Sequence, residues 1–336
     1  MEMQAEKNRS NFGYALRSFA FENPILLLLV VFFVASLLFV PNFSSIFNLK
    51  NFLLQAIDIM IVAAGVTFVV LNAGIDFSCT SVMALGSVMG AYIMAKSPLA
   101  GTSWAIPAGI VAMIGIGAIF GAVNGFSVVV LKMPSFIATL ATMMIGSGIA
   151  VWFTSIVADK AAIIGLPEQF FIIGGEKGFI LVPVLIAVVV VLLIHWLMTY
   201  TLFGRWIYIV GTNPKTANIS GVPVKRTVFT IMLLSGVFAG VASIIGTARN
   251  QAGIPTLGDK VFIDIIGAII IGGTSVFGGS GGVKQTVYGV LFITLMNNVV
   301  NLLGIEWFVI SLIKGILVLI AAFVDYFTKR QELIRR

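Results

Sequence analysis

The sequence of 336 residues contains few charged side chains. Only 10% of its residues are Asp, Glu, Lys or Arg, whereas an ordinary soluble domain has about 25%. Hydrophobic residues make up 59%, and the mean hydropathy is +1.10. Because so few charges cannot cover a water-exposed surface, most of the chain has to face lipid or other apolar helices. The composition therefore excludes a soluble enzyme, a disordered chain and a nucleic-acid-binding protein.

Cysteine and histidine are equally scarce, with Cys79 and His195 as the single examples. One cysteine cannot form an internal disulfide, and one thiol with one imidazole cannot hold a soft metal through several ligands, so we predict no metal site. The sequence also lacks a Gly-x-x-x-x-Gly-Lys-Ser/Thr phosphate-binding loop and a convincing Ser–His pair. We therefore assign no catalytic residue, and we expect neither ATP hydrolysis nor a bound cofactor in this chain.

Apolar stretches dominate what is present, and a membrane-spanning helix needs about 20 such residues. The predicted fold is an all-α polytopic membrane protein with about ten transmembrane helices. Polar and glycine-rich sequence breaks the helical pattern at residues 72–80 and 272–282, because glycine in a helix interior costs about 1 kcal/mol. The predicted spans cover residues 24–40, 52–71, 79–95, 105–131, 134–153, 180–199, 227–248, 262–273, 283–303 and 307–325.

The basic residues orient the chain, whose formal net charge is +7. An even number of spans places both termini on one side of the membrane. When that side is the cytoplasm, it holds thirteen of the twenty Lys and Arg residues, as the positive-inside rule requires. We predict a cytoplasmic N-terminal segment (1–23), one transmembrane domain (24–325) with a cytoplasmic loop (200–226), and a cytoplasmic tail (326–336).

The cytoplasmic loop contains one short predicted helix. Asn213 suits its N-cap, Pro214 its first position, and Gly221 the position after its end. An isolated helix of two turns is marginal in water, so the membrane surface or a partner protein should hold it. A solvated connector is the alternative interpretation, and the local sequence leaves both open.

Four sequence motifs occur in an order that is typical of one family. They are Asn72–Ser78, Lys132–Leu140, Gly211–Gly221 and Asp264–Gly279. With these motifs the chain resembles the permeases of ribose-type ABC sugar importers. The family usually reads Gly-Ile-Asp-Leu-Ser-Val-Gly-Ser at the first motif, whereas this chain has Phe77, Cys79 and Thr80.

The resemblance implies a permease in the bacterial cytoplasmic (inner) membrane that imports a monosaccharide or a similar solute. It implies three protein partners: a cytoplasmic ATPase subunit that binds ATP and Mg, a periplasmic or lipid-anchored solute-binding protein, and a second permease, identical or different. It also implies that two sets of spans are inverted repeats. The loop helix would couple to the ATPase through Asn213, Pro214, Lys215, Ala217, Ile219, Ser220 and Gly221.

The first helix break offers candidates for lining the transport path. Asn72, Gly74, Asp76 and Ser78 lie in it. Gly74 permits a tight reversal, Ser78 or Thr80 can cap the next helix, and Asp76 can accept N–H bonds at the start of that helix. Broken membrane helices often lie along transport paths, where the freed backbone groups line protein or water. Capping is the preferred interpretation for Asp76, and contact with the solute is the other.

The ninth predicted span carries four polar residues at i, i+3, i+4 and i+7, which places them on one helix face. Their side chains can line a sugar path, or they can join helices by hydrogen bonds of about 0.6 kcal/mol each. Both interpretations remain open. The residues are Thr294, Asn297, Asn298 and Asn301.

Ionisable side chains within spans are costly and should be paired or functional. The resembling family has an acid before its Gly-Gly-Thr-Ser segment and a Lys in its last span, so we expect an ion pair between Asp264 and Lys314. Asp58 has no predicted partner.

The predicted function is therefore that of the transmembrane permease in an ATP-driven importer that works by alternating access. The alternative is an ion-coupled transporter or a channel that acts without an ATPase and uses Asp58, Asp76 and Asp264 as coupling sites. The basic loop with its capped helix favours the ATPase-driven system.

Overall fold

The computed structural model describes residues 24–158, 161–177, 180–259 and 261–334, so the predicted N-terminal segment 1–23 lies outside the described residues. This part of the chain is all-helical except for one hairpin of two-residue strands, β1 (Glu176–Lys177) and β2 (Ile180–Leu181). The helices are α2 (Pro24–Phe39), α3 (Ile46–Leu71), α4 (Ser78–Ala95), α5 (Ala105–Val129), α6 (Ser135–Trp152) with a π-helical extension (Phe153–Val157), α7 (Glu168–Gly174), α8 (Val182–Tyr200), α9 (Leu202–Thr212), α10 (Pro214–Ile219), α11 (Val224–Asn250), α12 (Phe262–Gly272), α13 (Val283–Leu302) and α14 (Trp307–Ile334).

Each of the ten predicted spans coincides with one helix, but the helices differ in how well they suit a bilayer. Among the described residues, seven helices are long and apolar enough to cross a membrane: α3, α4, α5, α6, α8, α11 and α14. Of the other three, α2 and α12 are apolar but shorter. The third, α13, has 20 residues and carries the four polar side chains of the predicted polar face.

The bundle has a buried centre and exposed flanks. Helices α3 and α4 are each 78% buried over their most apolar stretch, whereas α14 is only 6% buried. Helices α5 and α11 touch backbone to backbone, because a Cβ atom on Gly117 would lie 2.1 Å from the Gly236 carbonyl oxygen. Glycines on these two helices therefore serve close packing within one chain.

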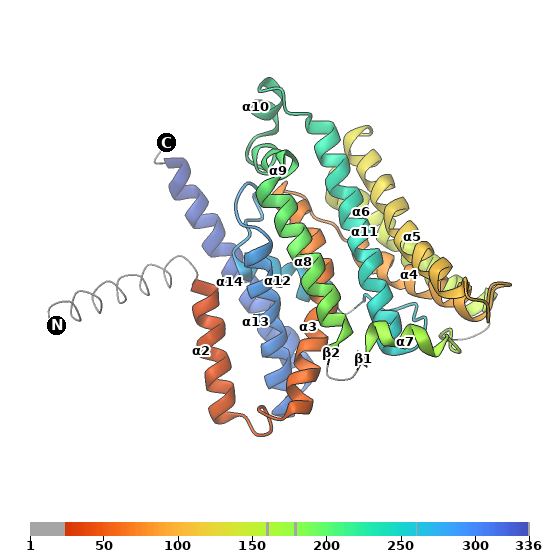
Figure 1. The fold of residues 1–336 in the computed structure, drawn as a ribbon. Coiled ribbons are helices and arrows are strands. Elements are labelled where there is room, and N and C mark those ends of the chain that lie inside the picture. Colours follow the sequence, from red (N-terminus) through yellow and green to blue (C-terminus); the bar gives the residue numbers. More distant parts are fainter. Residues whose placement is uncertain (1–23, 159–160, 178–179, 260, 335–336) are drawn as a thin grey trace, which may run out of the picture.

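Helix α10 lies at one end of the bundle, whereas the connection between α2 and α3 lies at the other (Figure 1). We call these the α10 end and the opposite end. Helix α3 runs from the opposite end to the α10 end, and α13 runs the other way (Figure 1).

The prediction of a single helix in loop 200–226 is incomplete, because α9 precedes α10 there. The start of α9 is capped by Thr201, whose Oγ1 accepts the N–H of Gly204 at 3.1 Å. At the other terminus, α14 continues to Ile334 and so includes most of the segment predicted as a tail.

Candidate functional site

The break between α3 and α4 is held by a buried polar network centred on Asp76, which is 1% exposed. Asp76 Oδ1 accepts hydrogen bonds from Ser78 N–H (2.9 Å) and Ser78 Oγ (2.6 Å), while Oδ2 accepts one from Ser235 Oγ of α11 (2.6 Å). Asn124 Nδ2 of α5 donates to Ser78 Oγ, and Thr142 Oγ1 of α6 donates to Asn124 Oδ1, both at 2.8 Å. The break therefore joins helices α4, α5, α6 and α11.

Two details of this break differ from the sequence-based expectation. Ser78 and Thr80 do not cap α4, because the N-cap position is Phe77 and both hydroxyls donate elsewhere, to Asp76 Oδ1 and to the Phe77 carbonyl. The left-handed residue is Ala73 (φ 55°) rather than Gly74. Gly74 instead allows close packing, since a Cβ atom there would lie 3.0 Å from Val69 Cγ1.

Asn72 occupies the C-cap position of α3, where its N–H bonds to the carbonyls of Val69 and Val70. Its side-chain Oδ1 is buried, and no hydrogen-bond partner for it exists among the described residues.

The polar side chains of α13 divide into two environments. Asn298 is buried and forms a reciprocal amide pair with Asn48 of α3, with N–O distances of 2.8 and 3.1 Å. Thr294 is also buried. Asn297 and Asn301 instead line a cleft between helices. The polar face of α13 therefore joins this helix to α3 through Asn298 and borders the cleft through Asn297 and Asn301.

That cleft has a volume of about 560 Å³ and lies between α3, α12, α13 and α14. Within it, Lys314 Nζ lies 2.5 Å from Asp264 Oδ1, so the structure brings the two predicted partners together. Asn297 Nδ2 donates to Asp264 Oδ2 at 3.2 Å. Gln55 and Asp259 also line the cleft. Asp259 lies in the loop before α12, and partial burial raises the pKa of its carboxyl group.

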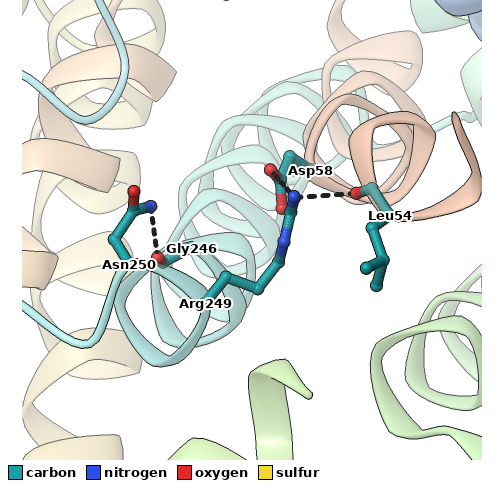
Figure 2. A network of polar contacts seen from close by, with 5 residues as sticks. All are labelled: Leu54, Asp58, Gly246, Arg249 and Asn250. Carbon is teal, nitrogen blue, oxygen red and sulfur yellow. Dashed lines mark hydrogen bonds and ion pairs between the residues drawn. The ribbon is translucent and has the colours of Figure 1, made fainter. Parts of the chain in front are cut away.

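Asp58, which had no predicted partner, pairs with Arg249 at the end of α11. Figure 2 shows the Arg249 side chain reaching from α11 to α3, where Nη1 contacts Asp58 Oδ2 and also donates to the Leu54 carbonyl at 2.8 Å. The guanidinium group therefore links two helices that are distant in sequence.

At the α10 end, the short helix has the predicted caps. Asn213 Oδ1 accepts the N–H groups of Lys215 and Thr216 at 3.0 and 3.1 Å, and Gly221 has φ +80° after the helix. The predicted contact residues point in two directions. Ala217 is fully buried against Val210, Val222 and Val228, whereas Ile219 is 86% exposed. Pro214, Lys215, Ser220 and Gly221 are also exposed.

The glycine-rich loop, residues 273–282, contacts α3 and α9 at the α10 end. Gly279 N–H donates to the Leu71 carbonyl at 2.9 Å. A Cβ atom on Gly211 of α9 would lie 1.9 Å from the same carbonyl oxygen. Tyr208 Oη of α9 donates to the Gly281 carbonyl at 2.9 Å, and burial raises the pKa of this phenol. Helix α9, the end of α3 and the glycine-rich loop thus meet through backbone atoms. We call this contact the glycine lock.

Asp325 ties α14 to the glycine lock. Its Oδ2 accepts hydrogen bonds from Ser275 Oγ (3.0 Å) and Val276 N–H (3.1 Å) of the glycine-rich loop. Sequence reasoning missed Asp325, Gln55 and Arg249. The signal for Asp325 and Gln55 was a polar residue within a predicted span, as it was for Asp58.

The fold and the site together define a multi-pass helical membrane protein with a polar cleft in its helical bundle and a capped helix at one end. Residues 48–322 match the family described as branched-chain amino acid transport system / permease component. The chain belongs to this family. It is a transport component of an ABC importer and not an enzyme, ATP hydrolysis resides on a separate subunit, and the protein is located in the bacterial inner membrane.

Curated relatives match along nearly the whole chain. The ribose import permease protein RbsC of Bacillus subtilis is 36% identical over 329 residues, which cover 96% of this chain and 97% of the relative. The Escherichia coli K12 protein of the same name is 32% identical, with 93% and 96% covered. The L-arabinose transport system permease protein AraH of the same strain is 32% identical, with 92% and 91% covered. No solved structure matches the chain.

Proposed function

We propose that the protein is the transmembrane permease of an ATP-driven importer for a small polyhydroxylated solute, a monosaccharide. The observation that carries this proposal is the similarity to ribose and L-arabinose permeases over more than nine-tenths of the chain. The description of the matching family refers to the transport of branched-chain amino acids. The curated relatives favour a sugar instead, and the cleft lined by amide side chains supports it.

The proposed topology has ten spans with both termini in the cytoplasm. Seven helices qualify by length and composition, and α2, α12 and α13 complete the set. Helices shorter than about 20 residues can cross where the bilayer thins locally or where flanking side chains extend to the interface. This arrangement places the α10 end in the cytoplasm and the opposite end outside, with one permease domain over residues 24–325.

Helix α10 is the proposed contact with the ATPase subunit. Its caps hold the short helix in shape, Ala217 fixes it to α9 and α11, and Lys215 and Ile219 are exposed for a partner. The importer also requires a solute-binding protein outside and a second permease in the membrane. In this scheme ATP binding by the partner favours one of the two states of the permease, open to the outside or open to the cytoplasm, over the other.

An ion-coupled transporter is a weaker proposal. Such a carrier would need acids that are accessible to the coupling ion. Asp76 is 1% exposed and receives three hydrogen bonds, whereas Asp58 and Asp264 each pair with a basic side chain.

The proposal is tested by purifying the tagged protein from its native membranes in mild detergent. We expect an ATPase to co-purify with the wild type and to be lost from the double variant Lys215→Glu, Ile219→Glu. The matched control is Lys96→Glu with Leu99→Glu, which also alters a lysine and an aliphatic residue, at the opposite end, where both are exposed. If no ATPase co-purifies under conditions that preserve other ABC complexes, the proposal is wrong.

A further inference from the structure

We propose that the cleft between α3, α12, α13 and α14 is a binding site of the permease itself for an uncharged solute rich in hydroxyl groups. We call it the amide cleft and define it by Gln55, Asn297 and Asn301 together with the Asp264–Lys314 pair. The inference rests on the proposed function and adds a site and a ligand class to it. The volume of about 560 Å³ lies in the usual range for small-molecule sites.

The lining has the chemistry that recognises hydroxyl groups. An amide side chain offers two N–H donors and one acceptor oxygen, so it can satisfy both roles of a sugar hydroxyl. Gln55 and Asn301 are exposed in the cleft. Asn297 is held in place because its Nδ2 donates to Asp264.

An unpaired acceptor points to a missing ligand. Asn297 Oδ1 is buried, and it has no hydrogen-bond partner within the described chain. A buried acceptor without a partner costs about 1–3 kcal/mol. A bound solute that displaces the side chains covering this oxygen would donate a hydroxyl group to it and remove that cost.

The charges of the cleft exclude anionic solutes. Lys314 is paired with Asp264 at 2.5 Å, and Asp259 adds a second carboxylate to the lining. A phosphorylated sugar or the carboxylate of an amino acid would meet these acids with no unpaired cation among the described lining residues to balance it. A neutral polyol meets no such repulsion.

A second hollow continues the amide lining toward the opposite end. It has a volume of about 300 Å³ and shares Gln55 and Asn301 with the amide cleft. Asn42 and Asn51 lie further along it. Lipid tails do not suit the amide cleft, because exposed amides and charges are costly in hydrocarbon. The second hollow therefore lies beside the amide cleft and shares its two exposed amides.

The test uses cysteines placed in the cleft of the full-length permease, purified from native membranes. The variants are Gln55→Cys and Asn301→Cys, and the control is Ser103→Cys in the exposed α4–α5 loop. The native Cys79 is fully buried and should not react. A positively charged thiol reagent is added with D-ribose, with L-arabinose, with leucine or with no solute, and the modification rate is measured.

We expect the reagent to modify all three variants and each sugar to slow modification of the two cleft cysteines but not of Ser103→Cys. At a sugar concentration twice its dissociation constant, the rate should fall about threefold, because only the unoccupied site reacts. Leucine should have no effect. The inference is overturned if the cleft cysteines do not react, if neither sugar protects them, or if leucine protects them as well as a sugar does.

The same preparations distinguish this inference from the proposed function. An ATPase that co-purifies with permease whose cleft shows no protection by sugar leaves the importer intact and rejects the binding site. Protection by sugar without any ATPase rejects the ATP-driven importer and retains the site.

Discussion

The glycine lock and the amide cleft are held together by different kinds of contact. At the α10 end, the glycine lock joins α9, the end of α3 and the glycine-rich loop through backbone atoms, with no room for a Cβ atom at Gly211. Toward the opposite end, side chains form the contacts around the amide cleft. Close-packed backbone has little freedom to rearrange, whereas polar side chains can exchange partners. We therefore expect the α10 end to move as one body and the cleft to respond to solute.

The largest expected effect concerns the ion pair of the cleft. Lys314→Ala or Asp264→Ala leaves a charge that is largely buried, which costs about 3–5 kcal/mol in proteins. The double variant Asp264→Asn, Lys314→Met leaves no unpaired charge and should be closer to the wild type. The unfolding temperature and the yield of each purified variant show which variants lose the most stability. Equal damage from the single and double variants would show that the pair does not stabilise the cleft.

The glycine lock is tested by Gly211→Ala. The new methyl group would lie 1.9 Å from the Leu71 carbonyl oxygen, so we expect a loss of about 3 kcal/mol, the upper end of overpacking costs. Transport in proteoliposomes should be nearly abolished. Gly115→Ala is the control, since a Cβ atom there meets no other atom within 4 Å. Wild-type transport by Gly211→Ala would mean that the α10 end is not rigid.

The link between the two ends is tested by Asp325→Ala. This change removes both hydrogen bonds that one partly buried carboxylate oxygen accepts, and a hydrogen bond to a charged group typically contributes about 1.5–3 kcal/mol. We expect the solute moved per ATP hydrolysed to fall several-fold, because α14 no longer follows the glycine-rich loop. Asp325→Asn keeps one acceptor oxygen and should be intermediate. If the amount of solute moved per ATP hydrolysed is unchanged in both variants, α14 does not take part in coupling.

The smallest effect concerns the reciprocal amide pair of Asn48 and Asn298. Hydrogen bonds between membrane helices contribute about 0.6 kcal/mol on average. A double-mutant cycle with Asn48→Ala and Asn298→Ala should therefore give a coupling energy near that value. A coupling of zero would show that this pair fills space without joining α3 to α13.

Much of the fold could be predicted because apolar runs, glycines and helix caps are local signals. Asn213, Pro214 and Gly221 specify α10 within a few residues of sequence. Partners across helices could not be predicted in this way, as Asp58 and Arg249 show: they are 191 residues apart in sequence, and only the packing of α3 against α11 brings them together.

The candidate site shows the same limit. The spacing of Asn297, Asn298 and Asn301 places them on one face of α13, but spacing alone does not tell which of them meets α3 and which borders a cavity. The ion pair of Asp264 and Lys314 was expected only through resemblance to a family. Gln55 carried too weak a local signal, because an isolated amide in an apolar helix fits several roles.

Helix α14 makes contacts with carboxylate groups at two separate points, Lys314 with Asp264 and Asp325 with the glycine-rich loop. Lys314 and Asp325 are eleven residues apart, so they lie about 16 Å from each other along the helix and within about 20° of the same face. A tilt of about 10° around the first point would displace the second by about 3 Å, more than a hydrogen bond tolerates. While both contacts hold, α14 can slide with its neighbours but cannot swing, so any swinging motion must begin by releasing one of the two carboxylates.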